Sequence, residues 1–239
     1  NVLVLNASHG LLLWPLMKRN PEGLSAASVR TDSDREIIAH FSSSLEELLR
    51  PLVIVSDAFS VFDKLEDGLM FRVISGRNVL SRLPEDRRIL ERMKDRLADD
   101  GMIALLEVIP QLSSRLSAFA PDNLREKLEE AEKTIYSADN PLVSWGKKEL
   151  EEAVLAVFPE AVFEYSENIE VRHLYPETLR GFYRGSYHIS GIAEDEFVNA
   201  FGDREVKWSN TVAIIRSGFA AAKDNPSAED WMAVNGKVH

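Results

Sequence analysis

Polar residues that suit ligand binding come directly after a short apolar segment near the start of the sequence. The loop Asn6-Ala7-Ser8-His9-Gly10 lies between a predicted strand and a predicted helix. Gly10 allows the backbone to turn tightly into that helix, whose first amide groups suit a nucleotide or a carboxylate. The alternative is a glycine that only starts a helix. One glycine instead of three argues against a dinucleotide fingerprint, and the absence of a phosphate-binding glycine-rich loop argues against ATP or GTP hydrolysis.

Two further segments carry weak candidates for catalysis. In Gly76-Arg77-Asn78, the Asn78 amide offers donors and an acceptor, and the Arg77 guanidinium offers a planar fork of donors. Glu107 closes another apolar segment, where its carboxylate suits the uptake of a proton from a substrate. The alternatives are a structural loop for Asn78 and a solvated side chain for Glu107.

Asp57-Ala58 directly follows a third apolar segment. A carboxylate there suits a hydrogen bond from an adenine amino group, and the alternative is a cap of a helix or turn. The sequence contains no G-x-S-x-G pentapeptide, so the adjacent Ser8 and His9 do not indicate a hydrolase.

The composition argues against several kinds of site and partner. The 239 residues include no Cys and five His, so disulfides, thiolate zinc sites and Cys nucleophiles are excluded, and we expect no metal site. The net charge of −11 argues against broad, direct nucleic-acid binding. No apolar run approaches the roughly 18–20 residues of a membrane span, so we expect no membrane partner and a reducing, cytoplasmic location.

Short apolar segments alternate with amphipathic segments over the first 110 residues. Strands that are apolar throughout indicate a sheet covered on both faces, and their alternation with helices indicates parallel βαβ units. Strands are predicted at residues 2–7, 24–30, 52–56, 71–75 and 102–109. Helices are predicted at residues 10–19, 32–41 and 84–97, with Asp32 and Ser33 as caps of the second and Asp100-Gly101 as the stop of the third.

The second half of the sequence predicts an antiparallel edge, formed by extended stretches at residues 161–174 and 205–216. Helices are predicted at residues 123–137, 147–158 and 193–201. The aromatic connection at residues 175–187 suits a lid over a substrate, although core packing is the expected role of at least half of its aromatic side chains. The predicted fold is therefore α/β, a doubly wound, mostly parallel sheet of about seven strands with an antiparallel edge.

We expect one domain over residues 1–219, followed by a weakly ordered tail at residues 220–239. The apolar run that begins at the second residue is interpreted as the start of a module from a longer polypeptide, because chain termini are commonly frayed.

The order of these loops resembles that of class I S-adenosylmethionine-dependent methyltransferases. The segments FRVISGRNVLSR at 71–82 and LADDGMIALLE at 97–107 are similar to segments of such enzymes. NPLVSW at 140–145 and VKWSNTVAII at 206–215 are similar to a methyltransferase-like module joined to AAA-type ATPases of the replication-associated recombination kind. The resemblance implies a Rossmann-like fold, S-adenosylmethionine as the cofactor, and an ATPase domain upstream in the same polypeptide.

The sequence departs from the family pattern V-L-D-x-G-x-G-x-G. Val4 stands at the acidic position, Asn6 at the first glycine and Ser8 at the second. Arg30 stands near the place of the acid that binds the ribose hydroxyls, unless the strand ends later and Asp32 takes that role. Carried over residue by residue, the resemblance assigns the following cofactor-binding residues: Asn6, Ala7, Ser8, Gly10, Arg30, Asp57, Ala58, Gly76 and Asn78.

Three functions stay open at this point. The first is an active methyltransferase whose acceptor approaches near Asn78 and Glu107, under the 175–187 lid. The second is a degenerate methyltransferase fold that docks on or regulates a partner ATPase without chemistry of its own. The third is a different nucleotide-dependent enzyme, such as an oxidoreductase that uses Arg30 to bind a 2′-phosphate.

Overall fold

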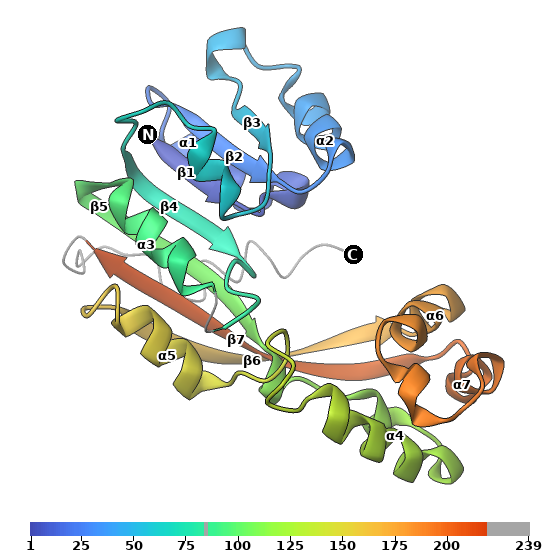
Figure 1. Cartoon of the computed structure of the whole chain (residues 1–239). Helices are drawn as coiled ribbons and strands as arrows, with labels where there is room; N and C mark the ends of the chain where they lie inside the picture. Colours follow the sequence, from blue (N-terminus) through green and yellow to red (C-terminus); the bar gives the residue numbers. More distant parts are fainter. Residues whose placement is uncertain (84–85, 219–239) are drawn as a thin grey trace.

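A mixed β-sheet organises the chain, in a computed structural model that describes residues 1–83 and 86–218 (Figure 1). In these residues the sheet has seven strands, in the order β3-β2-β1-β4-β5-β7-β6. The first five strands are parallel, β7 is antiparallel to β5, and β6 is antiparallel to β7. The predicted fold class is thereby confirmed. The strands are β1 (Val2–Leu5), β2 (Ser25–Val29), β3 (Leu52–Val55), β4 (Phe71–Arg77), β5 (Leu97–Ile109), β6 (Val162–His173) and β7 (Glu205–Gly218).

Helices cover both faces of the parallel part of the sheet. Alternate residues of β1 point to opposite faces. Val2 and Val4 pack with α1 (Leu13–Arg19) and α2 (Asp32–Ser42), whereas Leu3 and Leu5 belong to the core that α3 (Arg87–Asp95) and α5 (Lys147–Leu155) cover. Burial on both sides explains why the strand is apolar throughout instead of alternating.

The strand order reverses direction at β1. This strand pairs with β2 on one side and with β4 on the other, with Val4 opposite Ala27 and Leu5 opposite Gly76. The connections that leave the carboxyl ends of β1 and β4 therefore run to opposite faces of the sheet. In open α/β sheets this divergence produces the crevice in which ligands bind.

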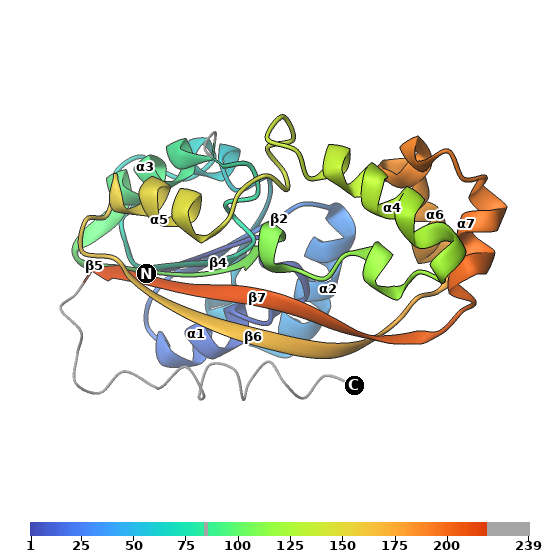
Figure 2. The same cartoon turned by 90° about the horizontal axis from the view of Figure 1, so that it is seen from below.

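The strands β6 and β7 extend beyond the rest of the sheet and carry a second hydrophobic core (Figures 1 and 2). The last residue of β5, Ile109, lies opposite Thr211, and from Asn210 to Glu205 β7 pairs with β6 alone. The second core contains large side chains from the helices packed on this ribbon. These helices are α4 (Asp122–Ile135), α6 (Pro176–Gly185) and α7 (Glu194–Phe201), with the short 3-10 helices Leu116–Phe119 and Tyr187–Ser190.

We call this unit the distal lobe: it comprises α4, α6, α7, the two 3-10 helices and the outer parts of β6 and β7. The expected single domain over residues 1–219 stays a prediction, and the expected tail at residues 220–239 lies outside the described residues. Among the described residues, no helix is both long enough and apolar enough to cross a membrane.

A buried carboxylate ties three segments of the distal lobe together. Glu132 of α4 accepts hydrogen bonds from the backbone N–H of Ser117 (3.0 Å), from the Ser117 hydroxyl and from the Tyr187 hydroxyl (2.8 Å). Burial raises the pKa of Tyr187, and the negative charge of Glu132 raises it further, so the phenol stays a donor at neutral pH. Buried charges are tolerated when they are hydrogen-bonded in this way.

Several element boundaries differ from the predictions for local reasons. The helix predicted at 84–97 begins at Arg87, and Pro84 lies outside the described residues. Asp100-Gly101 is not the helix stop: β5 already begins at Leu97, which pairs with Phe71. The cap of α2 is Thr31, whose hydroxyl accepts from the Asp34 N–H, instead of Asp32 or Ser33. The connection at 175–187 is largely helical, because Pro176 occupies the first turn of α6.

Replacing Tyr187 by Phe is expected to destabilise the distal lobe. The change removes one of the donors to the buried Glu132 carboxylate, and leaving a buried charge short of a hydrogen bond costs about 1–3 kcal/mol. Urea unfolding followed by tryptophan fluorescence measures the difference. The matched control is Tyr175→Phe, which removes the hydroxyl of an exposed tyrosine. Equal effects of the two changes would contradict a structural role for the Tyr187–Glu132 bond.

Candidate functional site

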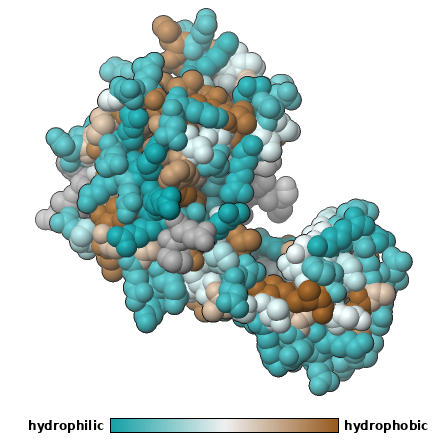
Figure 3. All heavy atoms as spheres, in the orientation of Figure 1, coloured by the Kyte–Doolittle hydropathy of each residue, from teal (hydrophilic) through white to brown (hydrophobic). Residues whose placement is uncertain are grey.

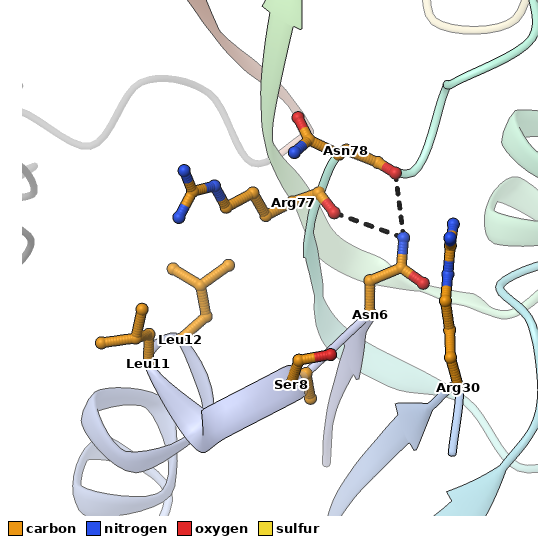
Figure 4. A pocket seen from close by; sticks show the side chains of 8 residues that line it. Asn6, Ser8, Leu11, Leu12, Arg30, Arg77 and Asn78 are labelled. Atoms are coloured by element: carbon orange, nitrogen blue, oxygen red, sulfur yellow. Dashed lines mark hydrogen bonds between the residues drawn. The ribbon is translucent and has the colours of Figure 1, made fainter. Parts of the chain in front are cut away.

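The side chain of Asn6 joins the carboxyl ends of β1 and β4 (Figure 4). Its Nδ2 donates to the backbone oxygens of Asn78 (2.9 Å) and Arg77 (3.3 Å). Its backbone N–H donates to the Ser28 hydroxyl of β2 (3.2 Å). Asn6 has a φ of +52°, a left-handed conformation that asparagine adopts more readily than most residues. One residue therefore fixes the ends of three neighbouring strands relative to one another.

A cavity of about 340 Å³ opens where these strands end. Its walls combine polar groups with two leucines from the segment that leads into α1, and Figure 4 shows how these side chains lie. The position is the one expected for a ligand in an open α/β sheet, and the size is within the usual range of small-molecule sites. The lining residues are Asn6, Ala7, Ser8, Leu11, Leu12, Arg30, Arg77 and Asn78.

Five of the nine residues predicted to bind a cofactor thus come together at this cavity: Asn6, Ala7, Ser8, Arg30 and Asn78. Their role in binding a cofactor stays a prediction. Leu11 and Leu12 line the cavity but are absent from the predicted cofactor-binding residues. Their position directly after Gly10, at the start of the predicted helix, is the signal that could have indicated them. The sequence indicates Arg77 only as a donor beside Asn78.

The two predicted glycines serve the packing behind the cavity. Gly10 has a φ of +72°, and a side chain there would overlap the Trp14 indole. Gly76 is buried between Val79 and Leu5, so a larger residue would push the loop after β4 away from β1. Both positions are confined to glycine by close approach, and neither lines the cavity.

Asp57 and Ala58 also lie away from the cavity lining. Ala58 is buried in the main core. Asp57 caps the turn that leads into the 3-10 helix Ser60–Asp63, because its Oδ1 accepts from the N–H groups of Phe59 (2.9 Å) and Ser60 (2.8 Å). Partial burial raises the pKa of Asp57, but these hydrogen bonds outweigh it, so the pKa is below its usual value. The alternative of a turn cap accounts for these carboxylate contacts.

Glu107 supports the loop after β4 from beneath. The side chain is 1% exposed, Oε1 accepts from the Val79 N–H (2.8 Å), and Oε2 accepts from the Leu80 N–H (3.2 Å). Burial raises the pKa of Glu107 to about 8, against the opposing effect of the two amides. Glu107 is absent from the cavity lining, and its predicted role in catalysis stays a prediction.

Asn78 directs one side of its amide inward and leaves the other for a ligand. It has a φ of +50°, its N–H donates to the Leu106 oxygen (2.9 Å), and its Oδ1 accepts from the Val108 N–H (3.1 Å). Among the described residues its Nδ2 has no acceptor. The cavity thereby gains a donor held in place by β5.

Arg30 follows the end of β2 and is exposed. The strand ends at Val29, and Asp32 lies in the first turn of α2 with an ion pair to Arg35 (2.7 Å). The later strand end on which the alternative role of Asp32 depends is therefore not found. In the described residues, no carboxylate lines the cavity.

The aromatic residues predicted as a lid pack mainly within the distal lobe. Tyr187 is buried in the second core, and Phe182 and Tyr183 pack against it. The Tyr183 hydroxyl donates to the Ile192 oxygen (2.8 Å), whereas Tyr175 is exposed. None of the four lines the cavity. Core packing, the alternative, accounts for most of this set.

No protein-family model and no curated protein matches the sequence. Among solved structures, the chain is similar to a candidate methyltransferase from Bacillus halodurans, with a TM-score of 0.53 at 10% identity over 92% of each chain. It is also similar to the YcgJ protein from Bacillus subtilis, with a TM-score of 0.51 at 11% identity over 92% of each chain. A third structure is the plantazolicin methyltransferase BamL in complex with SAH and a triazolic desmethylPZN analog, with a TM-score of 0.50 at 13% identity over 92% of this chain and 77% of that one.

The chain has the Rossmann-like fold of methyltransferases. At 10–13% identity the similarity concerns the fold alone. A fold does not determine an activity, so the activity has to be inferred from the residues of the cavity. The residues there fit an adenosyl group in part: Leu11 and Leu12 offer apolar surface, and Ser8 and Asn78 offer polar groups. The described residues hold no cluster of three or more side chains suited to a metal ion.

The free energy of unfolding is expected to fall between about pH 4.5 and pH 8 because of Glu107. A pKa raised in the folded state means that the fold holds the proton more tightly than the unfolded chain does. The stability linked to this proton is complete below about pH 4.5 and is lost as pH rises through about 8, with a slope of at most about 1.4 kcal/mol per pH unit.

Urea unfolding of Glu107→Gln across this pH range measures the contribution. The variant cannot ionise, so its stability is expected to depend less steeply on pH than that of the unchanged protein. Glu160→Gln, at an exposed carboxyl, is the control and is expected to keep the original slope. An unchanged slope in Glu107→Gln would refute proton uptake by Glu107.

Proposed function

We propose that this protein is an S-adenosylmethionine-dependent methyltransferase whose donor binds in the cavity at the ends of β1, β2 and β4. The observation that carries the proposal is the position of this cavity, at the reversal of strand order in a methyltransferase fold. The presence there of five residues assigned by the sequence pattern supports it. A cytoplasmic location is part of the same proposal.

The residues of the chain act mainly by positioning. A sulfonium donor supplies an electrophilic methyl group, which passes to the acceptor by direct displacement. Holding the two reactants in line accounts for much of such an acceleration, and few side chains are obligatory. Asn6 keeps the strand ends in register, Leu11 and Leu12 supply an apolar wall, and Asn78 orients a polar group on the β4 side.

The acceptor enters from the side of the distal lobe in this proposal. Figure 3 shows that the surface is hollowed between the larger part of the molecule and this lobe. The carboxyl ends of β2 and β4 point toward the same side (Figure 1). The far wall of this hollow is formed by the distal lobe as a whole, rather than by the 175–187 segment alone.

A second candidate function is a methyltransferase fold without activity that docks on or regulates an AAA-type ATPase upstream in the same polypeptide. Asn6 and Arg30, in place of a glycine and an acid, favour loss of donor binding. An exposed apolar patch favours docking: Leu48 is 97% exposed and Phe41 is 63% exposed, with Leu49 and Leu52 beside them in the sequence. A second cavity, of about 700 Å³, lies at this patch and is lined by Leu45, Leu48 and Leu49 among other residues.

A thermal shift separates the two candidates. S-adenosylmethionine or SAH, its demethylated product, at about 100 times its dissociation constant is expected to add about 2.7 kcal/mol to the free energy of unfolding. Differential scanning fluorimetry of the chain with millimolar ligand measures the shift. The absence of any shift would favour the docking function.

Arg30→Asp is expected to tighten binding of the donor by about tenfold. The new carboxylate accepts hydrogen bonds from ribose hydroxyls, and such charged hydrogen bonds are worth about 1.5–3 kcal/mol. Isothermal titration calorimetry measures the dissociation constant. Arg19→Asp makes the same charge change at the far end of α1 and serves as the control. Unchanged or weaker binding in Arg30→Asp alone would show that residue 30 does not face the ribose.

A further inference from the structure

The charge of the cavity is opposite to that of the chain. The chain carries a net charge of −11, with 39 acidic and 28 basic residues. The residues that line the cavity include Arg30 and Arg77 but no Asp or Glu. The described walls of the cavity therefore carry two positive charges within an acidic protein.

These two arginines differ from most other described arginines because their side chains have no partner among the residues that the structure describes. Arg180, for example, pairs with Glu194 and Asp195. The guanidinium groups of Arg30 and Arg77 make no hydrogen bond, ion pair or ring contact with another described residue. Each keeps its five N–H donors available to a ligand.

Arg77 stands on a fixed backbone at the β4 edge of the cavity. It is the last residue of β4, and its backbone oxygen accepts from Asn6 Nδ2 (3.3 Å). Figure 4 shows its side chain extending toward Leu11 and Leu12, while Arg30 lies on the other side of Asn6. The adjacent Asn78 adds its available Nδ2 donor to this edge.

A guanidinium group matches the oxygen atoms of a phosphate or carboxylate and repels a sulfonium cation. The positive potential at this edge therefore repels a sulfonium but attracts a carboxylate or phosphate, either the carboxylate of the donor itself or a group on the second reactant, and a competition experiment separates the two. We infer that Arg77 and Asn78 form an oxyanion subsite and that the methyl acceptor carries a phosphate or carboxylate group. Arg30 adds to the positive potential from the β2 side. The identification of the bound anion as a methyl acceptor rests on the proposed function, whereas the oxyanion subsite does not.

Titration calorimetry of the whole chain, with and without saturating SAH, tests the inference. Inorganic pyrophosphate and malonate are the probes, and their relative affinities distinguish a phosphate-bearing acceptor from a carboxylate-bearing one. Binding of one probe to the SAH-loaded protein is expected to weaken about tenfold in Arg77→Gln, the loss of one charge-assisted contact. Arg19→Gln is the control, because it removes an exposed arginine at the end of α1, outside the cavity.

The outcomes separate this inference from the proposed function. If SAH binds but neither probe binds, or if Arg77→Gln binds both probes as well as the unchanged protein does, the subsite is refuted and the methyltransferase proposal stands. If a probe binds through Arg77 but SAH does not bind, the donor proposal fails and the oxyanion subsite stands. If SAH and the probe compete, Arg77 belongs to the donor site and the acceptor assignment is overturned.

Discussion

The geometry of the cavity depends on the hydrogen bonds that the side-chain amide of Asn6 donates across the strand ends. Parallel strands separate at the reversal of strand order, and nothing in the sheet itself fixes the distance between the loops that leave them. Here the Asn6 side chain donates hydrogen bonds to the backbone oxygens of Arg77 and Asn78, and the Asn6 N–H donates to the Ser28 hydroxyl. The positive φ of both asparagines turns the chain away from the sheet at this point. The positions of Arg77 and Asn78 therefore follow from a bond that a glycine at position 6 does not make.

A second support lies beneath the same loop. Glu107, at the end of β5, accepts from the two amides that follow Asn78, and the Val108 N–H binds the side chain of Asn78 itself. The loop after β4 is thus held from β1 on one side and from β5 on the other. A loop fixed in this way presents donors to a ligand without first losing conformational freedom, which favours binding.

The sequence predicts the elements where the determining forces are local. Apolar runs of four to seven residues locate β1 to β4, and the antiparallel edge follows from two long extended stretches. The predicted start of β5 is too late, because pairing of Leu97 with Phe71 continues the strand across polar residues that lack a strand pattern. The sequence predicts part of the cavity lining, since strand ends can be located from the pattern. The packing roles of Gly10, Gly76 and Glu107 depend on neighbours distant in sequence, which no local pattern contains.

The extension of β6 and β7 past the end of β5 has a mechanical consequence. Beyond the end of β5 the described strand pairing is reduced to two strands, from the Asn168–Asn210 pair to the His173–Glu205 pair, and this part of the ribbon carries side chains of the second core. Two-stranded ribbons twist more strongly than broad sheets and have no third strand to stiffen them. We therefore expect twisting of the distal lobe against the main sheet to be taken up where the ribbon leaves β5, because no third described strand stiffens it there.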